Sequence, residues 1–101
     1  MNNRMKTVFS ALAENEAFAR SAAAAFVMPL DPTVEELTEI KTAVSEAVSN
    51  SVIHGYSGWE DRSQAMVELE CEINGNGRVT IIVSDHGRGI ANVEKAMQPL
   101  F

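Results

Sequence analysis

The sequence predicts an α+β fold: a two-layer sandwich with helices packed on one face of a mixed, mostly antiparallel sheet. Apolar residues recur at helical spacing in two segments of the first half of the chain. In the second half they alternate with polar residues, as in strands, on both sides of Asn74-Gly75-Asn76-Gly77, a typical hairpin turn. Helices and strands in this order can bury their apolar sides against each other in two layers.

The composition limits the class of protein. The chain has 101 residues, 46% hydrophobic and 22% charged, which fits a single globular domain over residues 1–101. A net charge of −6 with only eight Lys and Arg argues against direct nucleic-acid binding and fits a neutral or basic partner. No segment has the pattern of a secretory signal or the length of a membrane span, and one cysteine excludes an internal disulfide. We therefore expect a cytoplasmic protein.

The first elements are a strand and a helix. Met5–Ser10 alternates weakly, as a strand does. Glu14–Met28 is rich in alanine and glutamate and predicts a helix, which Pro29 and Pro32 end. Its apolar residues at helical spacing are Phe18, Ala22, Ala25 and Phe26.

A second helix is predicted from about residue 32 to residue 54, with Gly55 as its stop signal. Its start has two interpretations. Asp31 caps the helix with a proline in the first turn, or Thr33 and Glu36 form a capping box.

One side of this second helix is apolar. Its members are Val34, Leu37, Ile40, Val44, Ala47, Val48, Ser51 and Val52. Glu46 and Asn50 lie one turn apart on the opposite side, which would ordinarily be solvated. Because Ala43 and Ile53 share that side, it can instead form the wall of a cleft.

The remaining elements are strands and one short helix. Val67–Ile73 alternates apolar and acidic residues strictly, which indicates a strand with one solvated face. Cys71 is in phase with its apolar residues and is expected to be buried. Val79–Val83 predicts a more deeply buried strand that delivers Asp85 at its end, and Val93–Met97 predicts a short helix.

Glu46 and Asn50 have the chemistry of a site that activates a hydroxyl beside a nucleotide. Transfer of the γ-phosphoryl group of ATP to a hydroxyl needs a base that accepts the hydroxyl proton, and Glu46 is the candidate. Asn50 is adjacent on the helix and offers a neutral oxygen to Mg²⁺, an ion that keeps waters and phosphate oxygens in its shell.

Asp85, Gly87 and Gly89 form Asp-x-Gly-x-Gly at a strand end. The carboxylate can accept a hydrogen bond from the exocyclic amine of adenine, whereas guanine has a carbonyl there. The glycines let the backbone turn sharply and approach the base. Taken alone, these residues also fit an ordinary turn. Together with Glu46 and Asn50, these residues predict a site for ATP and Mg²⁺.

Other motifs are absent from the sequence. There is no dinucleotide Gly-x-Gly-x-x-Gly turn and no Walker loop. His54 and His86 are the only histidines and, with a single cysteine, do not make a zinc site. His54 is interpreted as a cap at the helix C-terminus, with a phosphate-side role as the alternative.

The combined pattern resembles the ATP-binding domain shared by gyrase, Hsp90, histidine kinases and MutL. Glu46–Asn50 is similar to its N box and Asp85–Gly89 to its G1 box. Four segments, at residues 14–20, 30–33, 37–56 and 98–101, are similar to the anti-sigma F factors of sporulating bacilli. This similarity extends over essentially the whole chain.

The resemblance implies a protein serine kinase that is also an anti-sigma factor. Such proteins are homodimers that hold the sporulation sigma factor F away from RNA polymerase and phosphorylate a serine of an anti-anti-sigma antagonist. It further implies Glu46 as the catalytic base and Asn50 as the Mg²⁺ ligand. Asp85, Gly87 and Gly89 are implied as the adenine site. Arg20 is implied as a contact to sigma factor and antagonist.

The family's sequences continue past Pro99-Leu100-Phe101 into a lid over the phosphates, a second glycine box and further strands. We therefore expect a truncated ATP-binding kinase domain with its C-terminal part missing, weak ATP binding and little kinase activity. The strand Val79–Val83 should also have an exposed edge. Two alternatives are a catalytically dead fragment that binds sigma factor and antagonist, and the ATP domain of a sensor histidine kinase. The second is disfavoured because a carboxylate base suits a hydroxyl acceptor better than an imidazole.

Overall fold

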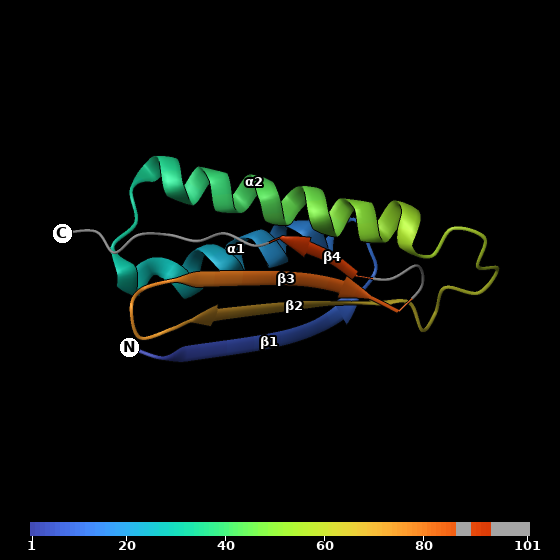
Figure 1. Ribbon diagram of the computed structural model, residues 1–101. Helices are drawn as coiled ribbons and strands as arrows, with labels where there is room; N and C mark the ends of the chain where they lie inside the picture. Colours follow the sequence, from blue (N-terminus) through green and yellow to red (C-terminus); the bar gives the residue numbers. More distant parts are fainter. Residues whose placement is uncertain (87–89, 94–101) are drawn as a thin grey trace.

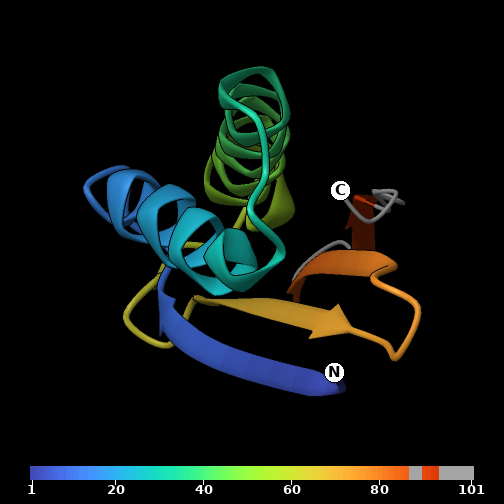
Figure 2. The same ribbon diagram turned by 90° about the vertical axis from the view of Figure 1, so that its left-hand side faces the viewer.

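The structure, a computed structural model, describes residues 1–86 and 90–93 and contains one sheet with the strand order β1-β2-β3-β4. Its strands are β1 (Asn3–Ser10), β2 (Met66–Ile73), β3 (Val79–Asp85) and β4 (Ile90–Val93), each antiparallel to its neighbours. The helices α1 (Asn15–Val27) and α2 (Val34–Asn50) lie on one face of the sheet (Figure 1). Figure 2 shows that neither helix covers the opposite face. The predicted two-layer α+β sandwich is confirmed.

Strand β4 corrects two expectations. It pairs with β3 from Ser84 opposite Ile90 to Ile81 opposite Val93, so the edge of β3 that was expected to be exposed has a neighbour. Val93 ends this strand and does not begin a helix. The rest of the expected helix, at 94–97, lies outside the described residues. A strand of four residues is too short for its alternation to be recognised in the sequence.

Helix α1 is present where it was predicted, and Ala22 and Phe26 of its predicted apolar residues are partly buried against the core, whereas Phe18 and Ala25 are exposed. Its buried residues are Ala19, Ala23, Ala24 and Val27. Phe18, predicted on the apolar side, is 50% exposed and meets Phe9 of β1 edge to face, with the ring centroids 5.9 Å apart. Because most of the buried side chains are alanines, the helix backbone can lie close to its neighbours.

Helix α2 begins with the predicted capping box. The hydroxyl of Thr33 accepts a hydrogen bond from the Glu36 N–H at 3.1 Å, and the Glu36 carboxylate accepts one from the Thr33 N–H at 2.9 Å. The alternative cap, Asp31, is not used. Its φ of 54° is left-handed, and it closes the 3-10 turn η1 (Met28–Leu30), which lies before the helix start.

The core lies between the helices and strands β1 to β3. It includes Ile40, Val44, Ala47 and Val48 of α2, and Val67, Leu69, Cys71, Ile73, Val79, Ile81 and Val83 of the sheet. Burial, and secondarily the charge of Glu70, raises the pKa of the Cys71 thiol to about 12. This thiol is therefore protonated at neutral pH and is a core residue, as predicted. In the part of the chain that the structure describes, no helix has the length and apolar character needed to cross a membrane.

Candidate functional site

Helix α2 continues directly into a π-helical turn, η2 (Ser51–Gly55), which ends where the sequence predicts the helix to end. A π turn contains one residue more than an α turn, so it changes the direction of the side chains that follow. Such turns are rare and are frequent at functional sites. Here the turn leads into Gly55 and Tyr56, both of which are buried.

Glu46 and Asn50 are both exposed on α2 and line one depression of about 410 Å³. Glu16 of α1, Ser45 and Ser49 complete its lining. Glu46 and Asn50 both lie away from the core, as their helical spacing indicates, and border this depression. No group of three or more His, Cys, Asp or Glu side chains among the described residues could hold a metal ion by itself. The oxygen atoms of Glu46 and Asn50 suit a hard ion such as Mg²⁺, which takes its other ligands from water and phosphate.

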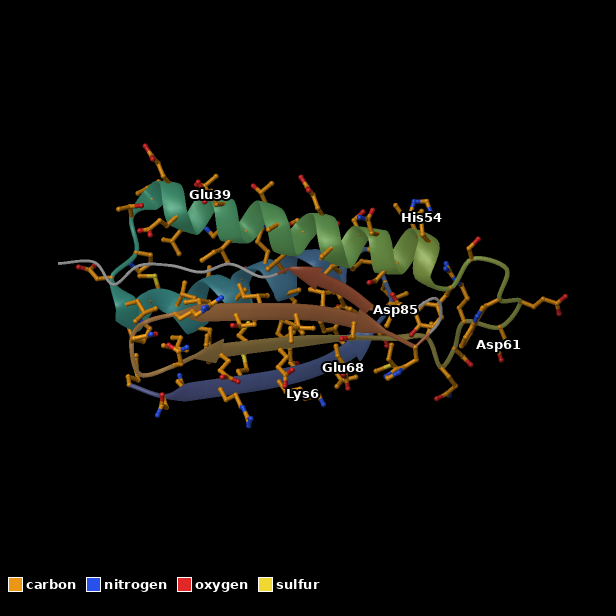
Figure 3. The ribbon with its side chains drawn as sticks, in the orientation of Figure 1. Lys6, Glu39, His54, Asp61, Glu68 and Asp85 are labelled. Carbon is orange, nitrogen blue, oxygen red and sulfur yellow. The ribbon has the colours of Figure 1, made fainter. Side chains whose placement is uncertain are left out.

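Asp85 ends β3, opposite Val67 of β2, and is only 8% exposed. Its carboxylate lies against the backbone of Gly55, because a Cβ added there would be 2.7 Å from Oδ2 and 2.8 Å from Cγ. Figure 3 shows Asp85 below the end of the helix, on the side that faces the sheet. The strand end and the helix end therefore meet at this carboxylate, and the contact requires glycine at position 55.

Gly55→Ala is expected to weaken both the fold and the site. The added methyl group would displace the Asp85 carboxylate, and overpacking of this kind costs about 1–3 kcal/mol of the free energy of unfolding. Urea denaturation measures the loss. Gly75→Ala is the matched control, because its Cβ would meet only Asn2 Oδ1, at 3.5 Å. Equal stability of the two variants would contradict the close approach.

Two further residues of the site were not predicted from the sequence. Tyr56 is 1% exposed, and its hydroxyl accepts hydrogen bonds from the N–H groups of His86 at 3.0 Å and Met66 at 3.1 Å and donates one to the Met66 carbonyl. Ser51 is 2% exposed, and its Oγ has no hydrogen-bond partner within residues 1–86 and 90–93. For Ser51 the sequence did contain a signal, because this hydroxyl-bearing residue interrupts the otherwise apolar side of the predicted helix.

The unpaired hydroxyl helps to test whether a nucleotide fits this region. Ser51 and Gly55 are about one turn apart and therefore lie on the same side of the helix, the side on which Gly55 contacts Asp85. An unpaired buried hydroxyl is unfavourable and can be satisfied by a polar group of a bound molecule. Among the described residues, neither Ser51 nor Asp85 lines the depression at Glu46 and Asn50. The polar groups therefore form two parts, which a ligand with several polar groups, such as a purine nucleotide, would have to bridge.

The structure places the other predicted site residues as follows. Arg20 is half-buried on α1, and its Nη1 donates to Ser45 Oγ at 3.3 Å, next to Glu46 in the chain. His54 is exposed near the end of η2, on the side away from the sheet (Figure 3). Gly87 and Gly89 lie outside the described residues.

Comparison with known proteins agrees with this arrangement. The family model of the histidine kinase-like ATPase domain matches residues 9–101. The chain is 54% identical over 100 residues to the anti-sigma F factor of Clostridium beijerinckii, a match that covers 99% of this chain and 67% of the relative. It is also 54% identical over 101 residues to the anti-sigma F factor of Anoxybacillus flavithermus, covering 100% of this chain and 66% of the relative. The anti-sigma F factor of Priestia megaterium is 50% identical over 101 residues, with 100% of this chain and 67% of the relative covered.

These matches extend across both parts of the site, from Glu46 and Asn50 on α2 to Asp85 at the end of β3. The chain spans about two-thirds of the length of the curated relatives that it matches. A histidine kinase-like ATPase domain is an ATP-binding domain. The chain belongs to the histidine kinase-like ATPase domain family and, within it, to the anti-sigma F factors.

Proposed function

We propose that this protein binds the sporulation sigma factor F and blocks its use by RNA polymerase, and that it is an ATP-dependent kinase for a serine of the anti-anti-sigma antagonist. One structural observation carries the kinase proposal. A single helix presents Glu46 and Asn50 to one depression and, one turn further on, contacts Asp85 through Gly55. The anti-sigma part is supported by the names of the relatives.

In this proposal Asp85 selects the nucleotide. Its buried carboxylate accepts a hydrogen bond from the exocyclic amine of adenine. Guanine would bring a carbonyl oxygen to the same carboxylate, with no proton between the two acceptors. Discrimination follows because two acceptor oxygens that face each other in a buried position repel each other.

Glu46 is the proposed base for the transfer. Its carboxylate takes the proton of the serine hydroxyl while the hydroxyl oxygen forms a bond to the γ-phosphorus of ATP. The bond from the γ-phosphorus to its bridging oxygen breaks, and ADP leaves. Asn50 Oδ1 would help to hold Mg²⁺, which neutralises charge on the phosphates when bound. The exposure of Glu46 lets the serine of a partner protein reach it.

Arg20 is the proposed contact with sigma factor and antagonist, and the protein is proposed to act as a homodimer in the cytoplasm. Arg20→Ala is expected to weaken sigma factor binding about tenfold, because a charge-assisted hydrogen bond contributes about 1.5–3 kcal/mol. Arg4→Ala is the control, since Arg4 pairs with Glu72 on the sheet face that no helix covers. Surface plasmon resonance measures both. An equal loss for the two variants would point to net charge alone.

A phosphorylation assay tests the proposed kinase. The intact protein is incubated with γ-labelled Mg·ATP and the purified antagonist, with an antagonist that lacks its serine as the control. The proposal predicts acid-stable label on the antagonist only. An acid-labile phosphohistidine would favour a histidine kinase, and the absence of label with retained binding of sigma factor would favour a purely binding protein.

A further inference from the structure

We propose that Tyr56 is a positioning residue for adenine recognition: its hydroxyl fixes the peptide group that follows Asp85 and so holds the carboxylate where the base can reach it. This inference rests on the proposed function, in which Asp85 reads adenine. The hydroxyl bonds the backbone of Met66 and His86, so it would act on Asp85 through the backbone and not by contact with the base.

The hydrogen-bonding capacity of the Tyr56 hydroxyl is fully used. It accepts from the N–H groups of His86 at 3.0 Å and Met66 at 3.1 Å, and it donates its own proton to the Met66 carbonyl. The side chain is 1% exposed, so water does not compete for these bonds. Removing the oxygen would leave two backbone donors without an acceptor, which is unfavourable in a buried position.

The three bonds join three parts of the molecule at the site. Tyr56 directly follows η2, Met66 begins β2, and His86 directly follows β3. The His86 N–H belongs to the same peptide plane as the carbonyl of Asp85, so its bond to the phenol fixes the backbone on one side of Asp85. Gly55 confines the carboxylate on the other side. Two consecutive residues, Gly55 and Tyr56, therefore determine the direction of one carboxylate.

The ring of Tyr56 is held in place as well. Trp59 packs edge to face against it, with the centroids 4.7 Å apart and the planes at 80°. Arg62, in the same loop, donates to the Val52 carbonyl of η2 at 3.0 Å. The phenol thus has little freedom to follow a displaced strand end, as a positioning group requires.

The test compares the affinities of the intact protein for Mg·ATP and Mg·GTP by isothermal titration calorimetry. Tyr56→Phe keeps the ring and removes the hydroxyl. It is expected to lower the affinity for ATP about tenfold, equivalent to about 1.4 kcal/mol, and to change the affinity for GTP less than about twofold. The preference for ATP over GTP therefore falls about tenfold. Asp61→Asn, a change at an exposed position of the same loop, is expected to keep the wild-type preference.

Equal losses for ATP and GTP in Tyr56→Phe would overturn the inference and leave Tyr56 a structural residue; unchanged affinities would overturn it too. If the variant does not fold, hydrogen exchange of the unaltered protein provides the test. The His86 amide is then expected to be protected, and exchange at the rate of an open peptide would refute the proposal. A wild-type protein that binds ATP and GTP equally would contradict the proposed function itself.

Discussion

Asp85→Asn is expected to lower the affinity for Mg·ATP at least about 100-fold, equivalent to about 2.8 kcal/mol. The carboxylate offers only acceptors, whereas the amide offers a donor group that can face the adenine amine and loses the charge that strengthens the bond. Asparagine has nearly the same shape, so the contact with Gly55 is retained and the fold should be kept. Calorimetry with the intact protein measures the loss.

The matched control for this change is Asp61→Asn, in the exposed loop between η2 and β2. Asp61 accepts a hydrogen bond from the Ser63 N–H at 2.9 Å and lies in the loop, apart from Asp85 (Figure 3). Its replacement should leave the affinity for ATP unchanged. An Asp85→Asn protein that binds ATP as the wild type does would exclude Asp85 as the adenine acceptor.

Glu46→Gln is expected to lower kcat for phosphorylation of the antagonist by a factor of about 10²–10⁴, the usual contribution of a general base. The affinity for ATP should change by less than about twofold, because Glu46 has no proposed contact with adenine. A fall in kcat without a change in nucleotide binding separates a catalytic role from a binding role. Quenched-flow measurement of phosphoserine over a range of Mg·ATP concentrations up to saturation provides both values.

Glu35→Gln is the control for this second experiment, since Glu35 is exposed in the first turn of the same helix, far from the depression. It should keep the wild-type rate. A Glu46→Gln protein that phosphorylates within about threefold of the wild-type rate would show that another group, or the phosphate itself, accepts the proton.

The sequence predicted most strongly the elements that show long and regular patterns. Helix α2 has several turns of regular helical spacing, and the capping box at Thr33 was one of two predicted starts. The end of the continuous helical segment, at Gly55 of η2, was predicted directly. The alternation of apolar and acidic residues in Val67–Ile73 corresponds to an alternation of buried and more exposed side chains along β2. The position of Glu46 and Asn50 followed from the same helical spacing, because an angle around a helix axis depends on sequence alone.

The features that were missed depend on contacts between distant segments. Strand β4 exists because it pairs with β3, and four residues have too weak a pattern to predict this. The buried side of α1 was predicted only in part, because its most buried residues are mainly alanines, which allow close packing, and not the larger Phe18. The hydroxyl of Tyr56 meets His86 thirty positions away, which no local pattern reveals.

The central claim is that a nucleotide binds between the end of the long helix and the tip of β3. Titration of the ¹⁵N-labelled intact protein with Mg·ATP, followed by ¹H–¹⁵N NMR, tests the location directly, even for weak binding. The account predicts saturable shifts at the side-chain amide of Asn50 and at the backbone amides of Gly55, Asp85 and His86. It also predicts much smaller shifts at these positions with Mg·GTP. Shifts confined to other surfaces, or none at all, would contradict the account.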